Sequence, residues 1–269
     1  MFGKTREGYY SVSKEKRMRR ELSEKEILDT VRDIRHEAPG IGAYKLYLML
    51  KELYPDGMRG RDWFYGLLHK SQLMLKPGKR RHTTSSNHPY RKYKNMIKEL
   101  TVNRINQLWV ADITYIDTDE GVAYLHLLTD AFTHEIIGWV LSDSLVASNT
   151  VTALDMGISH VSPLGFDGLI HHSDRSVQYC CNQYIDRQQA IKATISMTED
   201  YKPTDNTIAE RVNGIIKQEW LYRMKRPPDV VVARDLLARI IDFYNNRRAH
   251  RSNRDMLPPV RFREALTCM

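Results

Sequence analysis

Three carboxylates stand where acidic side chains need an explanation. Asp112 lies inside the apolar run LWVADITYI, where a buried and unpaired carboxylate would cost free energy. Asp174 follows the apolar segment GLIHHS, and Glu210 lies near the start of a long helical pattern, with 35 residues between these two acids. Each one alone has an ordinary structural explanation, as a hydrogen-bonded strand acid, a turn cap or a first-turn helix acid.

Together the three carboxylates predict a metal site. If strands and a helix bring them to one edge of a sheet, three hard oxygen donors suit Mg²⁺, which binds few carboxylates and keeps positions for water and phosphate. Two such ions would hold the attacking and leaving oxygens of a phosphoryl displacement, without a Ser, Tyr or Cys nucleophile. We therefore expect Asp112, Asp174 and Glu210 to be catalytic and metal-binding, with Mg²⁺ as cofactor and Mn²⁺ able to substitute.

The residues around these acids predict an α/β domain with a mixed sheet. β-branched and aromatic runs favour strands, and apolar residues at helical spacing favour helices. The predicted order βββ–α–β–α–β–α, followed by one more helix, comes from segments 107–117, 122–132, 134–142, 147–161, 168–174, 182–191, 193–197, 205–224 and 230–248. A mixed sheet with helices packed on it can collect side chains from different strands at one edge.

The first hundred residues predict a small helical module between two basic segments. Residues 1–22 form a basic arm, and residues 23–75 hold three short helical patterns separated by Pro39-Gly40 and Pro55-Asp56-Gly57. Three short helices with tight turns in a basic region fit a helix-turn-helix module, although any small helical bundle would give the same pattern. Residues 76–100 are a basic linker by composition.

Charge divides the chain into three parts. The net charge is +11 over residues 1–100, −10 over residues 101–210 and +7 over residues 211–269, which gives +8 overall. Basic flanks favour a nucleic-acid partner, because Lys and Arg displace counterions from the phosphate backbone. An acidic centre would repel that polyanion unless cations lie between them, and bound metal ions would supply those cations.

The sequence as a whole resembles a known family. The segments LWVADITYI, YLHLLTDAFTHEIIGW, HHSDRSVQY, ISMTEDYKPTDNTIAERVNGIIKQEW and FYNNRRAHRS are similar to the second-reading-frame (OrfB) transposases of the insertion-sequence-three family. The resemblance runs from about residue 30 to the end of the chain. It implies a retroviral-integrase-like, RNase H-like core over residues 101–225 with a DDE triad at Asp112, Asp174 and Glu210. Residues 226–269 then form a C-terminal helix and basic tail.

The family implies a function and partners. It implies a Mg²⁺-dependent polynucleotidyl transferase that cleaves DNA at insertion-sequence ends and transfers the freed 3′ end to target DNA. Its partners would be double-stranded DNA, further copies of the chain on paired ends, and an upstream-frame OrfA protein or fusion. The alternatives are an RNase H-like nuclease without strand transfer, and a catalytically impaired DNA-binding remnant.

Several neighbours of the triad are predicted DNA contacts. Asn213 and Lys217 lie within about 60° of Glu210 on a helix of 3.6 residues per turn, and the family has a DNA-contacting lysine matching Lys217. Further predicted contacts are Arg175, Gln178, Lys79, Arg80 and Arg81. For Gln178 a loop hydrogen bond is an equal alternative, and the linker cations would otherwise be solvated.

Four other positions have structural interpretations. Asp205-Asn206 is expected to cap the long helix, and Asp130 is read as a structural acid. At least one of His171 and His172 should point into the core. Ser176 stands where the family usually has Gly, so it would strain the turn by about 1 kcal/mol if that turn needs positive φ.

The remaining composition excludes several classes. Cys180, Cys181 and Cys268 form neither a disulfide framework nor a paired-cysteine metal site. No run of eighteen apolar residues exists, and the N-terminal residues do not resemble a secretory signal. We therefore expect no membrane partner and a cytoplasmic location, and the family resemblance implies a bacterial protein that associates with the nucleoid when bound to DNA.

Overall fold

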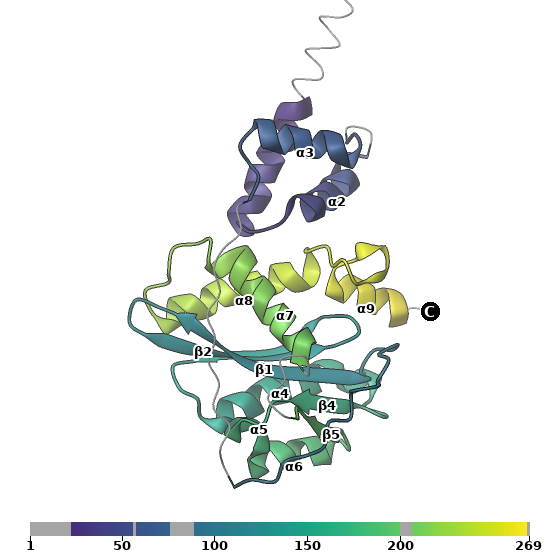
Figure 1. Ribbon diagram of the computed structural model, residues 1–269, viewed down its shortest axis with the longest axis vertical. Coiled ribbons are helices and arrows are strands. Elements are labelled where there is room, and N and C mark those ends of the chain that lie inside the picture. Colours follow the sequence, from purple (N-terminus) through teal and green to yellow (C-terminus); the bar gives the residue numbers. More distant parts are fainter. Residues whose placement is uncertain (1–22, 56–57, 76–88, 200–205, 268–269) are drawn as a thin grey trace, which may run out of the picture. The chain divides into compact units, whose positions relative to one another are not determined.

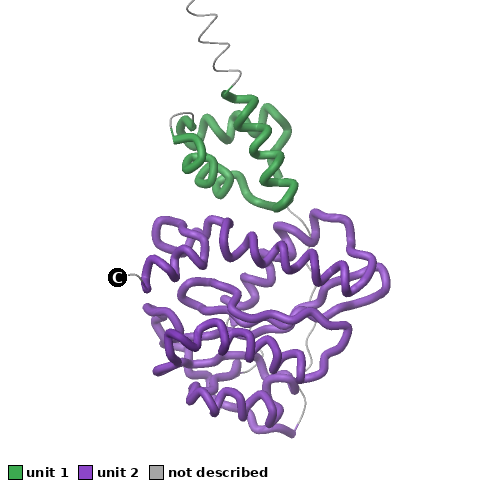
Figure 2. The backbone as a smooth tube through the Cα atoms, turned by 180° about the vertical axis from the view of Figure 1, so that it is seen from behind, with its two compact units in different colours: residues 1–77 green, residues 78–269 purple. Residues whose placement is uncertain are grey.

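The computed structural model describes residues 23–55, 58–75, 89–199 and 206–267. Two compact units divide the chain, residues 1–77 and residues 78–269 (Figure 2). The predicted basic arm, residues 1–22, and the predicted DNA contacts Lys79, Arg80 and Arg81 lie outside the described residues.

The described part of the first unit contains helices and no strand. A helix over residues 23–37 is followed by α2 (Ala43–Leu53) and α3 (Arg61–Lys70), and all three were predicted. Their apolar residues recur at helical spacing, so one face of each helix contributes to a shared core. The buried side chains are Ile27, Val31, Ile34, Leu46, Leu50, Phe64, Leu67 and Leu68.

The second unit is built on the predicted mixed five-stranded sheet. Its strands are β1 (Leu108–Asp117), β2 (Val122–Asp130), β3 (Ile136–Ser142), β4 (Ile170–Ser173) and β5 (Thr194–Met197). The order across the sheet is β3-β2-β1-β4-β5. The first three strands form an antiparallel meander, and β4 and β5 join in parallel beside β1. This is the RNase H-like arrangement that the family resemblance implied.

Helices cover both faces of this sheet (Figure 1). On one face lie α4 (Ala147–Val161), α5 (Val177–Cys180) and α6 (Asn182–Ala190); on the other lie α7 (Thr207–Ile216), α8 (Val230–Asn246) and α9 (Pro259–Thr267). Side chains alternate along β1 and pack against both helical layers. Trp109 and Ala111 face the first group of helices, and Leu108 and Val110 face the second. Asp112 continues the second series and therefore faces α7.

The predicted single helix over 205–224 is two elements. The α-helix α7 ends at Ile216, and a π-helical turn continues over Lys217–Leu221. A π turn accommodates one extra residue, and the periodicity of apolar residues does not reveal such an insertion. Trp220 in this turn is fully buried and contacts Phe243 of α8 edge to face, with ring centroids 6.0 Å apart.

The C-terminal helices belong to the second unit and protect the edge strand β3. Asn245 of α8 pairs with the backbone of Ile136, accepting from its N–H at 3.0 Å and donating to its carbonyl at 2.9 Å. Arg234 donates to the Leu141 carbonyl further along the same strand, at 3.2 Å. Side chains thus satisfy an edge that would otherwise expose backbone groups. None of the described helices is long and apolar enough to cross a membrane.

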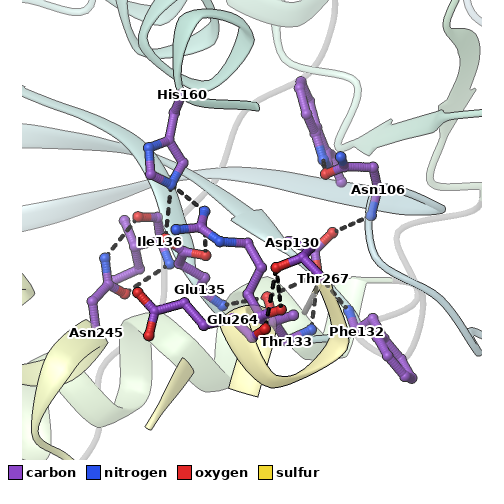
Figure 3. Close-up of polar contacts among 12 residues, drawn as sticks. Asn106, Asp130, Phe132, Thr133, Glu135, Ile136, His160, Asn245, Glu264 and Thr267 are labelled. Atoms are coloured by element: carbon purple, nitrogen blue, oxygen red, sulfur yellow. Dashed lines mark hydrogen bonds and ion pairs between the residues drawn. The ribbon is translucent and has the colours of Figure 1, made fainter. Parts of the chain in front are cut away.

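A buried carboxylate joins the sheet to both helical layers. Glu135, just before β3, is 1% exposed. Its two oxygens contact Nε2 of His160 in α4 and Nη1 of Arg263 in α9, each at 2.8 Å (Figure 3). Because a buried carboxylate without partners is costly, these two contacts fix the relative positions of α4, α9 and the β2–β3 connection.

The histidines of β4 are both buried, which confirms the prediction that at least one points inward. His171 Nε2 lies 2.9 Å from the Tyr184 hydroxyl, and His172 Nδ1 lies 2.8 Å from the Ser196 hydroxyl. Burial lowers the pKa of His171 to about 3, and burial likewise lowers the pKa of His126 on β2 to about 4. Both imidazoles are neutral in the folded unit.

The neutral side chains of His126 and His171 make the second unit less stable in acid. In the unfolded chain each would bind a proton near pH 6.5, so below about that pH the unfolded state binds more protons than the folded one. We expect the free energy of unfolding to fall by about 1.4 kcal/mol per pH unit for each histidine. Urea unfolding of a His171→Gln variant, measured between about pH 6.5 and 4.5, should show a shallower decline than the parent. An identical slope would contradict a neutral His171.

Candidate active site

Parallel pairing of β1 with β4 brings two of the predicted acids together. Trp109 pairs with His171 and Val110 with His172, and the same register carried two residues further brings Asp112 level with Asp174. Neighbouring strands lie about 4.8 Å apart, so the backbones of these two residues lie close together, and the negative charge of Asp174 raises the pKa of Asp112. Both belong to the series of side chains that faces α7.

Two asparagines of the α7 region contact this part of β1. Asn213 donates from Nδ2 to Oδ2 of Asp112 at 2.7 Å, and Asn206 donates to the carbonyl of Ala111 at 3.2 Å. Asn206 occupies the N-cap position of α7, but its side chain makes no cap hydrogen bond, so the predicted capping role is wrong for this residue. Asp205, the other half of that prediction, lies outside the described residues.

The electrostatics of Asp112 show how closely the acids are grouped. Burial raises the pKa of Asp112 to about 7, and the negative charges of Asp174 and Glu210 add to the rise. Hydrogen bonds from the Ile113 N–H and from Asn213 act in the opposite direction. The Asp112 carboxyl therefore ionises less readily than that of an ordinary aspartate.

Glu210, the third predicted acid, lies in the first turn of α7, where its side chain is exposed. Among the described residues, no three His, Cys, Asp or Glu side chains are grouped closely enough to hold a metal ion. The structure thus brings Asp112 and Asp174 together and leaves Glu210 near them, without a completed cage.

The donor set nevertheless fits a hydrated divalent cation. Burial is the main cause that raises the Asp112 pKa, the charges of Asp174 and Glu210 add to it, and a cation bound beside these carboxylates would act in the opposite direction. Within the described chain, the buried amide oxygens Oδ1 of Asn206 and Asn213 have no hydrogen-bond partner. Both are acceptors beside Asp112, as required by the water ligands that Mg²⁺ usually retains.

Lys217 lies on the same side as Asp112, at the start of the π turn. Burial lowers the pKa of its half-buried ammonium, and the charges of Asp112 and Asp117 act against that effect. Glu219 in this turn forms a bidentate ion pair with Arg248, with N–O distances of 2.8 and 3.0 Å. Arg248 is 3% exposed, so this pair is buried and holds the turn to the end of α8.

The turn after Asp174 does not strain Ser176. Ser176 has φ −69° and ψ 153°, an extended conformation that any residue adopts, and its N–H donates to Asp174 Oδ1 at 2.9 Å. Positive φ is not required, so the conditional strain of about 1 kcal/mol does not arise. Serine in place of glycine therefore gives no structural reason for an impaired site.

The other predicted contacts near Asp174 have different surroundings. Arg175 is half-buried beside Asp174. Gln178 is buried and donates to the Leu145 carbonyl at 2.9 Å, which is the loop hydrogen bond considered as its alternative. Burial raises the pKa of the Cys180 thiol to about 11, so this sulfur is no thiolate nucleophile.

Asp130 has the surroundings of a structural acid (Figure 3). Its Oδ1 accepts from the Phe132 N–H, the Thr133 N–H and the Thr133 hydroxyl, at 2.8 to 3.1 Å, and its Oδ2 accepts from the Asn106 N–H at 2.9 Å. Four hydrogen bonds occupy this buried carboxylate at the turn after β2, where it fixes the connection to β3.

Comparisons with known proteins agree with this geometry. The integrase core domain family matches residues 102–203, and a second integrase core domain profile matches residues 191–259. The uncharacterized 31 kDa protein of insertion element IS600 from Shigella sonnei is 32% identical over 98% of this chain and 96% of its own length. The transposase for insertion sequence element IS904 from Lactococcus lactis is 28% identical, over 84% of this chain and 90% of its own.

The chain belongs to the insertion-element transposases with an integrase core domain. It is therefore a polynucleotidyl transferase that acts on DNA. Among solved structures, the HTLV-2 integrase catalytic core domain in complex with magnesium (trimeric form) is 17% identical; the match covers 59% of this chain and 96% of that one, with a TM-score of 0.45.

The sequence did not indicate every residue that shapes the site of this transposase. Asn206 was predicted to cap a helix, whereas its side chain contacts β1. The ion pair between Glu219 and Arg248 was not predicted. The partners in each contact are far apart along the chain, so no local spacing reveals them. For Glu219 the available signal was an acidic residue beside the buried Trp220, in a segment otherwise read as a plain helix.

Asn213 and Lys217 should respond differently to substitution. A hydrogen bond to a charged group contributes about 1.5–3 kcal/mol, so Asn213→Leu should lower the rate at saturating DNA by about tenfold or more and leave the Kd for DNA unchanged. Lys217→Gln should instead raise that Kd. Single-turnover cleavage and fluorescence anisotropy measure the two effects, with Asn246→Ala on the exposed face of α8 as control. A raised Kd for Asn213→Leu would assign it to DNA contact.

Proposed function

We propose that Asp112, Asp174 and Glu210 are the catalytic triad of this transposase and hold divalent metal ions. Mg²⁺ is the proposed cofactor, and Mn²⁺ can substitute. The observation that carries this proposal is the alignment of Asp112 with Asp174 across β1 and β4, with the charge of Glu210 acting on the same carboxylate. A protein region this rich in fixed negative charge can receive a DNA phosphate only when cations lie between them.

The residues divide the work of positioning. Bound metal ions would activate the attacking oxygen and neutralise the charge that develops on the phosphate. Asp112 and Asp174 present their carboxylates from the sheet, and Asn213 holds the first of them in orientation. Glu210 and Lys217 approach from α7 and the π turn, so one helical element supplies both a metal ligand and a cation for the DNA backbone.

The proposed reaction has two phosphoryl transfers. First, a water oxygen attacks the phosphorus at the element's end, the bond to the 3′ oxygen breaks, and a 3′ hydroxyl is released. That hydroxyl then attacks a phosphorus of target DNA and displaces its 3′ oxygen, so one phosphodiester forms as another breaks. Each proton lost by the nucleophile is balanced by one gained at the leaving oxygen. No covalent link between protein and DNA is needed.

The assembly and location follow from this reaction. We propose that copies of the chain act together on two paired element ends, and that an upstream-frame OrfA protein, separate or fused, assists them. The helices of residues 23–75 are proposed to contact the end sequence, together with the basic linker residues Lys79, Arg80 and Arg81 and with Arg175 beside the site. Because the substrate is bacterial DNA, the proposed location is the cytoplasm, at the nucleoid.

Labelled terminal-repeat oligonucleotides with Mg²⁺ test the triad. The protein should cleave at the end and join pre-cut ends to target DNA. Asp112→Asn, Asp174→Asn and Glu210→Gln should each lower both rates at least about a hundredfold, roughly 3 kcal/mol of transition-state stabilisation, while DNA binding persists.

Glu120→Gln, an exposed acid at the β1–β2 turn, is the matched control and should keep both activities. Equal products from the parent and Glu210→Gln would show that the triad assignment is wrong. Cleavage without joining of pre-cut ends would favour a nuclease.

A further inference from the structure

The second half of the predicted linker is held against the sheet. We name residues 89–100 the edge segment. Within it, Met96 N–H donates to the Ser196 hydroxyl at 2.8 Å, Asn95 N–H donates to Glu199 Oε1 at 3.0 Å, and the Lys94 carbonyl accepts from the Met197 N–H at 3.3 Å. These contacts place the edge segment at the outer edge of β5, where that strand ends.

Apolar side chains of the edge segment pack on both faces of the sheet. Tyr93 lies against the cluster of Cys180, Ile185 and Met197. Ile97 and Leu100 lie against the opposite cluster, which contains Leu108, Val110 and Ala209. The segment therefore crosses the edge of β5 and is fixed on each side of it.

This packing leaves a row of cations pointing to solvent. Positions 93, 95 and 97 are partly buried, whereas the alternating residues Lys92, Lys94 and Met96 are exposed. Lys98 is paired with Glu199, and the guanidinium of Arg91 lies over the Tyr93 ring at 4.9 Å. In the described part of the chain, neither Lys92 nor Lys94 forms an ion pair, so their charges face the surroundings.

The row lies beside the proposed active site. Met197, which contacts Lys94, pairs in β5 with Ser173 of β4, the residue before Asp174. Two strand spacings, about 10 Å, therefore separate the Lys94 backbone from the residue before the second triad acid. The charges of Lys92 and Arg175 both lower the pKa of Cys180 in α5, so these two cations lie near the same short helix.

From this placement we infer that Lys92 and Lys94 bind the phosphate backbone of duplex DNA next to the reacting phosphate. The inference rests on the proposed function and adds a second DNA-contact surface on the Asp174 side, across the site from Lys217. Here the DNA ligand is recognised by charge without regard to base sequence, because exposed ammonium groups on an ordered backbone match phosphates rather than base edges. A segment fixed to the sheet also holds these cations in place before DNA arrives, so less ordering accompanies binding.

The salt dependence of DNA binding tests this inference. Each phosphate contact contributes about 0.9 to the slope of log Kd against log salt concentration, so Lys92→Gln/Lys94→Gln should lower that slope by nearly 2. At physiological salt the Kd for a terminal-repeat duplex should rise on the order of tenfold. Lys92→Arg/Lys94→Arg keeps the charges and should restore both values. The matched control is Lys192→Gln, an exposed lysine just before β5, at its other end.

The lysine variants and the triad variants should fail in different ways. With DNA at saturating concentration and low salt, Lys92→Gln/Lys94→Gln should cleave at the parent rate, whereas triad variants bind DNA and do not cleave. Equal melting temperatures for the parent and the double variant would show that the fold is intact. An unchanged salt slope in the double variant, or an equal loss in Lys192→Gln, would overturn the inference even if the triad is correct.

Discussion

The burial of Asp112 close to other carboxylates is the constraint on which the second unit depends. Asp112 and Asp174 are adjacent because β1 and β4 pair in parallel, and the charge of Glu210 acts on the same point from α7. Without a cation this arrangement raises the pKa of Asp112 to about 7, with burial as the main cause. The rest of the fold has to supply the stability that holds like charges together.

That stability comes from both sides of α7. On the inner side, Asn213 and Asn206 hydrogen-bond to Asp112 and to the backbone of β1. On the outer side, the buried pair of Glu219 with Arg248 and the packing of Trp220 hold the π turn to α8. A buried ion pair contributes little net stability but strongly penalises loss of one partner, so it suits the role of fixing one position of the turn.

Local patterns in the sequence predicted the five strands and most of the helices but not the short helices α5 and α9, and the triad that the family resemblance implies stays a prediction. β1 reads as a strand because Trp109, Val110 and Ile113 are strand-favouring residues, and Asp112 stands out against them. Contacts between distant residues were not predictable in this way. Nothing near Asn206 indicates that its side chain reaches Ala111 instead of capping α7, and helical periodicity conceals the π turn at Lys217.

The linker shows a similar limit. Its composition predicted a basic linker over residues 76–100, yet Tyr93, Ile97 and Leu100 pack on the second unit. These three residues are four and three positions apart among many charged residues, so the segment shows no strand-like alternation. Whether a polar segment with few apolar residues is ordered depends on the edge it meets, and that edge is formed by β5, about a hundred residues later.

The central claim is that Asp112 and Asp174 form a metal-binding pair. Anomalous diffraction from crystals of the protein grown with Mn²⁺ tests it most directly, because the ion is located independently of activity. We predict an anomalous peak in contact with carboxylate oxygens of both Asp112 and Asp174, which is lost in crystals of Asp174→Asn. A peak confined to other residues, or none at these carboxylates in well-ordered crystals at millimolar Mn²⁺, would contradict it.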